Sequence, residues 1–393
     1  MKEEPRTSTL LWTVFSATCG LGFAQLLVFG LLSQVPTATH GTMLGFGIAF
    51  CAAGRILASM ILLRNAHRLT GHHLLLMALA VPALFATAQD QGAAITSSPL
   101  YALLVAAGFC GLYTVLTYRL NTMVFVNRGR PARERLGRQM QIPYLIAQVL
   151  APIGAGIFHD RWGATLTGLA AGGLFLLTAL FAANHEGPGP SPAAARRAPL
   201  PPRTRTLLVI AGTSTFLINW YFSAIASALE TTPATSHIGF SISAIGIAAL
   251  VGAILANRFH PRRPQLIRDL FLASSVAPLL LMPTAALVGL ADPLSIVALL
   301  VSMGFPAGIS TSLVGASKYR YVERTDYPRF HQYLAMTVVV ATLSGSLSGA
   351  WVTIGNSFIE AMTLGLLLSL LSIIWILFGR SHLLTEDPLP TSD

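Results

Sequence analysis

The segment EGPGPSPAAARRAPLPPRTR, residues 186–205, divides the chain into two parts. Its proline, glycine, alanine and arginine residues cannot form a buried core and are typical of a mobile linker. On each side of it, apolar runs of about 20 residues recur, which is the length that crosses the ~30 Å hydrocarbon core of a bilayer as a helix. We therefore predict an integral membrane protein whose two parts meet at this linker.

Six apolar runs precede the linker and six follow it, so the predicted fold is all-α with twelve transmembrane helices in two pseudo-symmetric six-helix bundles. The predicted N-terminal bundle covers 1–185, the cytoplasmic linker 186–205, and the C-terminal bundle with a short cytoplasmic tail 206–393. The predicted spans are 10–32, 43–63, 73–89, 99–118, 141–158, 164–184, 206–229, 238–256, 270–290, 293–316, 332–354 and 358–379.

The composition agrees with a protein that lies mostly in lipid. Of the 393 residues, 53% are hydrophobic and 10% charged, whereas soluble domains carry roughly 25% charged residues. All Lys and Arg residues except Arg55 and Arg161 fall in the termini, the linker and the alternate loops on one side of the membrane. By the positive-inside rule, both termini are cytoplasmic and the protein lies in the inner or plasma membrane. The net charge of +10 then faces anionic membrane lipid, and we expect no nucleic-acid partner.

Two loops at equivalent places in the two halves are alike. The loop after the second span reads HRLTGHH (67–73), and the loop after the eighth reads NRFHPRR (257–263). Both have an arginine second, a turn former fifth and two basic or titratable residues last. The fifth span contains APIGAG (151–156), and FHDRWGATLTGLAAGGLF (158–175) follows it.

These motifs resemble those of the major facilitator superfamily over the whole chain. The paired loops resemble its Asp-Arg-x-Gly-Arg-Arg loops, and APIGAG resembles the Gly-Pro-x-x-Gly-Gly motif of its exporters. The resemblance implies secondary transport by alternating access, with the first, fourth, seventh and tenth helices around a central cavity. The fourth span, 101–116, lacks the arginine common in drug/proton antiporters of that family, so the resemblance does not imply proton antiport by that route.

The seventh span carries polar and small residues on one helical face, because they are spaced three or four apart. Such a stripe is expected to face water or another helix rather than lipid. Together with the first, fourth and fifth spans, it supplies the candidate substrate-binding residues, among which the aromatic rings would contact apolar parts of the substrate. These candidates, apart from Arg55, are Gln25, Tyr113, Thr117, Tyr144, Gln148, Thr215, Asn219, Trp220 and Ser223.

Arg55 lies within the second span, roughly 13 Å from its inner end at Arg64. A charge at that depth needs a partner, since an unpaired one costs from ~2.5 kcal/mol upward. Glu230 is the only acid predicted to share the cavity, but it lies roughly 16 Å along its helix from Asn219. We therefore predict that Arg55 binds an anionic group of the substrate, and that Glu230 is the candidate proton carrier. The alternatives are a snorkelling or helix-capping Arg55 and a solvated Glu230 at a helix end.

Four residues are candidates for gates and hinges. Arg68 and Arg258 belong to the paired basic loops, which either close the cytoplasmic gate or only set the topology. Pro152 removes a hydrogen bond within the fifth helix, and either a hinge or small-residue packing would explain it. The sequence GFPAG (304–308) predicts a break in the tenth helix at Pro306, which a cavity or a neighbouring helix would have to satisfy.

The predicted function is export of a small anionic or amphiphilic molecule, such as a metabolite, siderophore, toxin or drug. Uptake of a sugar or organic acid is the alternative, and a membrane enzyme or receptor is a weaker one. Proton coupling stays open. The chain has no G-x-x-x-x-G-K-[ST] loop for ATP, and no catalytic constellation, so we predict neither an enzyme nor a cofactor. Adjacent histidines at 72–73 lack Cys or acidic partners, so we predict no metal site. We expect a monomer.

Overall fold

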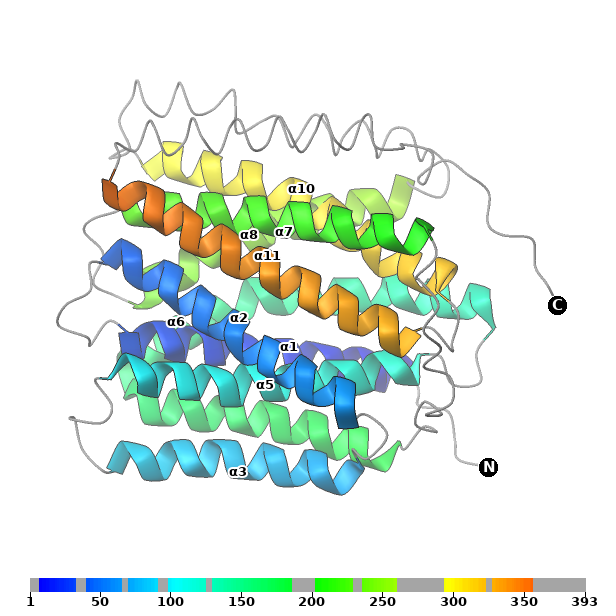
Figure 1. Ribbon diagram of the computed structural model, residues 1–393, viewed down its shortest axis with the longest axis horizontal. Coiled ribbons are helices and arrows are strands. Elements are labelled where there is room, and N and C mark those ends of the chain that lie inside the picture. Colours follow the sequence, from blue (N-terminus) through cyan, green and yellow to red (C-terminus); the bar gives the residue numbers. More distant parts are fainter. Residues whose placement is uncertain are drawn as a thin grey trace.

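The computed structural model describes residues 7–32, 40–65, 70–90, 98–124, 129–185, 202–228, 235–259, 293–322 and 327–355. These ranges form helices that run roughly side by side along the long axis of the molecule (Figure 1). The helices are α1 (Thr7–Leu32), α2 (His40–Asn65), α3 (Gly71–Asp90), α5 (Pro99–Met123), α6 (Arg130–Asn184), α7 (Pro202–Ala228), α8 (Thr235–Phe259), α10 (Pro293–Tyr321) and α11 (Tyr327–Gly355).

Ten of the twelve predicted spans coincide with described helices. The spans predicted at 270–290 and 358–379 lie outside the described residues, so twelve helices and the domain bounds stay predictions. Of the predicted linker 186–205, residues 186–201 also lie outside them, whereas 202–205 form the start of α7. α6 covers the fifth and sixth spans in one run of 55 residues. Its helix is interrupted at Gly163, where φ is 76° and ψ is −177°. Glycine adopts this conformation without steric strain, so a single residue joins two membrane-length helices.

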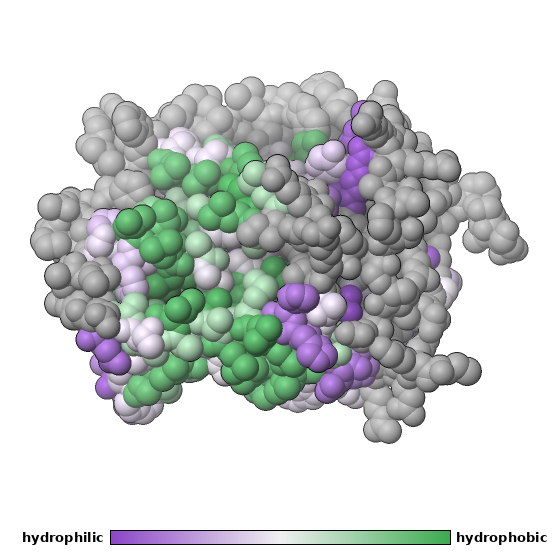
Figure 2. Space-filling model, turned by 60° about the horizontal axis from the view of Figure 1, so that its bottom comes forward, coloured by the Kyte–Doolittle hydropathy of each residue, from purple (hydrophilic) through white to green (hydrophobic). Residues whose placement is uncertain are grey.

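The described surface is apolar where lipid is expected. Five of the described helices are long and apolar enough to cross a membrane: α1, α3, α5, α6 from Pro131 and α8 from Gly239. A broad hydrophobic surface covers much of the described part of the face seen in Figure 2. Leucines on α3, α5 and α6 contribute to the exposed apolar area, and they include Leu76, Leu84, Leu104 and Leu177. Since such exposure is unfavourable in water, it supports the prediction of a multi-pass membrane protein.

The helices before the linker pack mainly with one another, as do those after it. α1 lies against α5 and α6, while α7 lies against α10 and α11. The halves meet along α6 and α8 and along α2 and α11. A further apolar cluster joins the two halves where α5 and α10 end and α11 begins, through Val124, Val322 and Phe330.

Candidate functional site

A cavity of about 270 Å³ lies between the two halves. α1, α2, α5 and α6 form one wall, and α7, α10 and α11 form the other. The helices predicted to surround a central cavity, the first, fourth, seventh and tenth, all contribute to it. The described lining residues are Val14, Thr18, Arg55, Tyr113, Thr114, Thr117, Leu120, Asn121, Met140, Gln141, Tyr144, Ala211, Ser214, Thr215, Ser310, Thr311, Val314, Gly315, Lys318, His331, Leu334, Ala335 and Val338.

Arg55 reaches the cavity because α2 packs closely on α5. A Cβ atom added at Gly54 would lie 2.6 Å from the Cα atom of Ala107, so only glycine allows this approach. The Arg55 guanidinium carbon lies 5.7 Å from the centre of the Tyr113 ring, a cation–π distance. Its Nε donates no hydrogen bond to any described residue. The group therefore retains hydrogen-bonding capacity beside the cavity.

Lys318 supplies a second cationic side chain from the opposite wall. It is 9% exposed, and its Nζ donates to Oδ1 of Asn121 at 3.0 Å. Asn121 in turn donates from Nδ2 to the Thr117 carbonyl at 2.7 Å, which fixes its oxygen toward the lysine. This hydrogen bond joins α10 to α5 across the two halves of the molecule.

His331 of α11 lies beside Tyr118 of α5, with ring centres 5.3 Å apart in an edge-to-face arrangement. The imidazole lines the cavity and can donate a hydrogen bond in either tautomer. Arg55, Lys318 and His331 therefore come from three different helices to one space. No Asp or Glu is present among the described lining residues. The charged side chains among these described lining residues are Arg55 and Lys318, which favour a negatively charged occupant.

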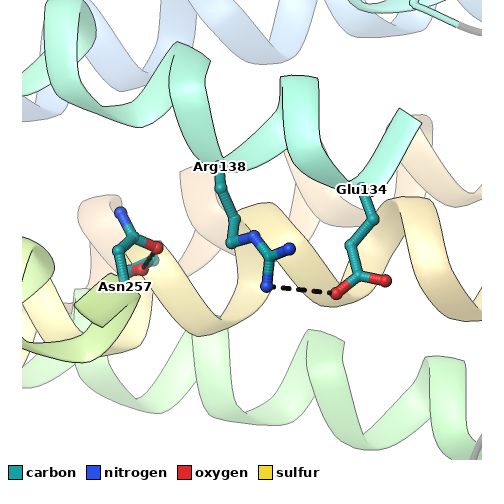
Figure 3. Close-up of polar contacts among 4 residues, drawn as sticks. Glu134, Arg138 and Asn257 are labelled. Atoms are coloured by element: carbon teal, nitrogen blue, oxygen red, sulfur yellow. Dashed lines mark hydrogen bonds and ion pairs between the residues drawn. The ribbon is translucent and has the colours of Figure 1, made fainter. Parts of the chain in front are cut away.

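Acidic residues in the described part of the chain lie elsewhere. Glu134 forms an ion pair with Arg138 of the same helix at 3.4 Å, and His159 lies 3.9 Å from Asp160. Figure 3 shows the Glu134–Arg138 pair near the start of α6, together with Asn257 of α8. Asn257 accepts a hydrogen bond from Ser312 of α10 at 2.6 Å. None of these residues lines the cavity.

The structure brings five of the predicted binding residues together along the cavity, namely Arg55, Tyr113, Thr117, Tyr144 and Thr215. Gln148 lies behind them and donates from Nε2 to the Tyr144 hydroxyl at 2.7 Å. Gln25, Asn219, Trp220 and Ser223 are not among the described lining residues. Glu230 and Arg68 lie outside the described residues. Arg258 is exposed, with its guanidinium 5.8 Å from the Phe259 ring centre.

The polar stripe of α7 divides between two surroundings. Thr215 lines the cavity, but Asn219 donates to the Thr215 carbonyl of its own helix at 2.7 Å. Farther along, a Cβ atom added at Gly349 of α11 would lie 3.2 Å from the Cβ of Ser223, and Trp220 is buried. Thr215 therefore faces the cavity, whereas Ser223 packs against α11.

Pro152 and Pro306 both lie where helices approach closely. Ala151 contacts α1 at Gly22, and the Pro152 carbonyl faces Gly239 of α8. These contacts favour the packing interpretation of APIGAG, while its role as a hinge stays a prediction. The predicted break at Pro306 is wrong, because α10 is helical from Pro293 to Tyr321. The neighbouring glycine, Gly308, instead lets α10 contact the α8 backbone at Ala249.

Sequence analysis missed Lys318 and His331. The former was placed in a cytoplasmic loop, and the latter falls one residue before the predicted eleventh span. A signal was present: Thr311, Val314 and Lys318 recur at helical spacing, as do His331, Leu334 and Val338. Extending both helices through these basic residues would have placed them on the faces that line the cavity.

Comparison with known proteins identifies the fold. A bacterial homologue of the iron transporter ferroportin, in its outward-facing state with soaked iron, is 16% identical with a TM-score of 0.66, covering 96% of this chain and 100% of that one. The human organic anion transporter MFSD10 (TETRAN) is 16% identical with a TM-score of 0.65, and the match covers 94% of this chain and 99% of that one. The inward-facing state of a bacterial ferroportin homologue is 14% identical with a TM-score of 0.63, and the match covers 96% of this chain and 98% of that one. No protein-family model and no curated sequence matches the chain.

Proposed function

Because the chain has the fold of the major facilitator superfamily transporters, we propose that it is a secondary transporter of small amphiphilic organic anions. Transporters of this fold form a family without enzymatic activity. Two bundles around one central cavity suit alternating access, in which the bundles move about a shared site.

The single observation that carries the proposal is the charge of the cavity. Arg55 and Lys318 enter it from opposite halves, and no acid is present among its described lining residues. A carboxylate, sulfonate or phosphate would neutralise these side chains through charge-assisted hydrogen bonds. An iron cation, the solute named for the ferroportin homologue, would meet repulsion instead. The organic anions named for MFSD10 fit the cavity better.

The rest of the lining supports an amphiphilic solute. Val14, Met140, Val314 and Leu334 are apolar, and Tyr113 and Tyr144 present aromatic rings. Such a surface binds hydrocarbon or aromatic parts that a fully polar anion lacks. A sugar has no charge for Arg55, so the cavity favours organic acids over sugars.

For direction we propose export, on the basis of the exporter-like APIGAG motif, with uptake as the alternative. Glu230 is the proposed proton-carrying carboxylate. The test of this part uses inside-out and right-side-out vesicles with an imposed pH gradient. Glu230→Gln is expected to abolish gradient-driven accumulation while leaving exchange intact. Equal accumulation by wild type and variant would remove Glu230 from the mechanism.

The main experiment measures flux of a panel of aromatic and aliphatic carboxylates, with their neutral amides, into liposomes containing the purified protein. We expect carboxylates to be transported and amides not. Arg55→Gln is expected to raise the half-saturating carboxylate concentration roughly ten- to hundredfold, as expected for loss of a hydrogen bond to a charged group. Ser344→Ala, on an exposed position of α11, is the matched control. Equal transport of amides and carboxylates would contradict the proposal.

A further inference from the structure

We propose that the cavity is a two-ended site for an elongated organic dianion, one acidic group binding at Arg55 and the other at Lys318 and His331. This inference rests on the proposed function and names its substrate class. Helix α5 contacts all three of these side chains.

The contacts of Arg55, His331 and Lys318 with α5 give the spacing of these three side chains. The guanidinium of Arg55 lies over Tyr113, the ring of His331 lies against Tyr118, and the ammonium of Lys318 is bonded to Asn121. At ~1.5 Å per residue, Tyr113 and Asn121 are roughly 12 Å apart along the helix axis. Arg55 and Lys318 therefore bind at opposite ends of the cavity, too far apart for one carboxylate to contact both.

Several hydroxyl donors of the lining already have hydrogen-bond acceptors within the protein. Thr114 donates to the Cys110 carbonyl at 2.9 Å, and Thr117 donates to the Tyr113 carbonyl at 2.9 Å. Across the cavity, Ser214 and Ser310 bond to each other at 2.9 Å. Val14, Met140, Val314 and Leu334 supply apolar surface among them. The middle of the cavity thus suits a hydrocarbon or aromatic spacer, and anionic groups gain most at the ends.

The two cationic ends also belong to different halves of the molecule. Arg55 is carried by α2, and Lys318 by α10. The charges of a dianion bound at both ends bridge the halves, whereas the charge of a monoanion bound at Arg55 contacts a cation of only one half. In an alternating-access transporter, the doubly charged solute would hold the halves together in the loaded state, so length and charge number both become determinants of specificity.

The test compares dianions with monoanions of equal length. Wild-type protein in liposomes is assayed by counterflow with α,ω-dicarboxylates from succinate to sebacate, each alongside its monomethyl ester. We expect the long diacids to act at concentrations at least roughly tenfold lower than their half-esters, and succinate to show no such advantage, since it cannot span roughly 12 Å. Equal potency of long diacids and half-esters would overturn the inference. This comparison needs no variant.

Two variants test whether Lys318 binds the second acidic group of the solute. Lys318→Gln is expected to bring the diacid-to-half-ester preference close to one, whereas Lys318→Arg, which keeps the charge, retains most of it. A preference unchanged by Lys318→Gln would exclude Lys318 as the second end. Thermal unfolding of each variant in detergent reports whether it is folded, and a misfolded variant leaves the wild-type series decisive. If wild type transports no anion of either kind, the proposed function fails rather than the two-ended site.

Discussion

The contact between α6 and α8, which we call the seam, and the cavity both lie between the two halves of the molecule. They differ in the chemistry of their side chains. The seam is apolar and includes small residues, with Leu145, Ala249 and Ala253 in one buried cluster and the Gly239 backbone against Pro152. The cavity presents Arg55 and Lys318, and its described lining contains no acid.

The difference separates residues that pack the two halves together from residues that, under the proposed function, would select the solute. Small side chains let helices approach closely, and in lipid this close packing is a main source of helix association. The cationic side chains Arg55 and Lys318 line the cavity instead. Substitutions in the seam should therefore affect stability first, and substitutions in the cavity should affect affinity first.

The largest effect is expected from Gly239→Val in the seam. Its Cβ would overlap the Pro152 carbonyl, and a backbone atom cannot move aside as a side chain can. Overpacking of this kind costs about 3 kcal/mol, so we expect a marked fall in the apparent Tm of the purified protein in detergent. An unchanged Tm would show that the seam is looser than the structure has it.

The next effect tests the cavity through Thr311→Asp, which adds an acid to the lining of α10. The carboxylate would compete with the solute for Lys318 and repel anions, so the half-saturating concentration of a transported anion is expected to rise tenfold or more. Thr311→Asn, similar in size and uncharged, is the control. If both variants transport equally well, the charge of the cavity does not govern affinity.

A smaller effect is expected from Ser243→Ala, which removes a hydrogen bond across the seam. Its hydroxyl donates to the Val149 carbonyl of α6 at 2.6 Å. Loss of one neutral hydrogen bond costs about 1 kcal/mol, visible as a modest drop in Tm with anion affinity retained. Ser344→Ala serves as comparison, because its hydroxyl bonds within α11 to the Val340 carbonyl. A change in anion affinity without a change in Tm would contradict the prediction that seam residues act on stability and cavity residues on affinity.

The smallest effect is expected from Gly154→Ala in the APIGAG motif. No atom lies within 4 Å of the Cβ that alanine would add, and alanine favours helix over glycine by about 0.5–1 kcal/mol. The apparent Tm should stay equal or rise slightly. A drop in transport rate at unchanged Tm would instead indicate that flexibility at this glycine matters, in support of the hinge.

The sequence predicted most of the described helices because a membrane span needs a long apolar run, which composition alone reveals. The sequence also predicted that Arg55 faces a cavity, because a charged side chain far inside a membrane span requires polar surroundings. It missed Lys318 and His331 because basic residues near span ends were assigned to loops. It also predicted a break at Pro306, since the close packing of α10 on α8 cannot be read from one helix alone.

The pairing of Gly54 with the α5 backbone, which delivers a guanidinium to the centre of the molecule, has an electrical consequence. Under the proposed function, an empty carrier with a fixed cation in its interior would respond to voltage, at about 2.3 kcal/mol per elementary charge per 100 mV of potential crossed. A loaded carrier, neutralised by its cargo, responds much less. Membrane voltage is then expected to act mainly on the return of the unloaded protein, so turnover would depend on potential even where solute binding does not.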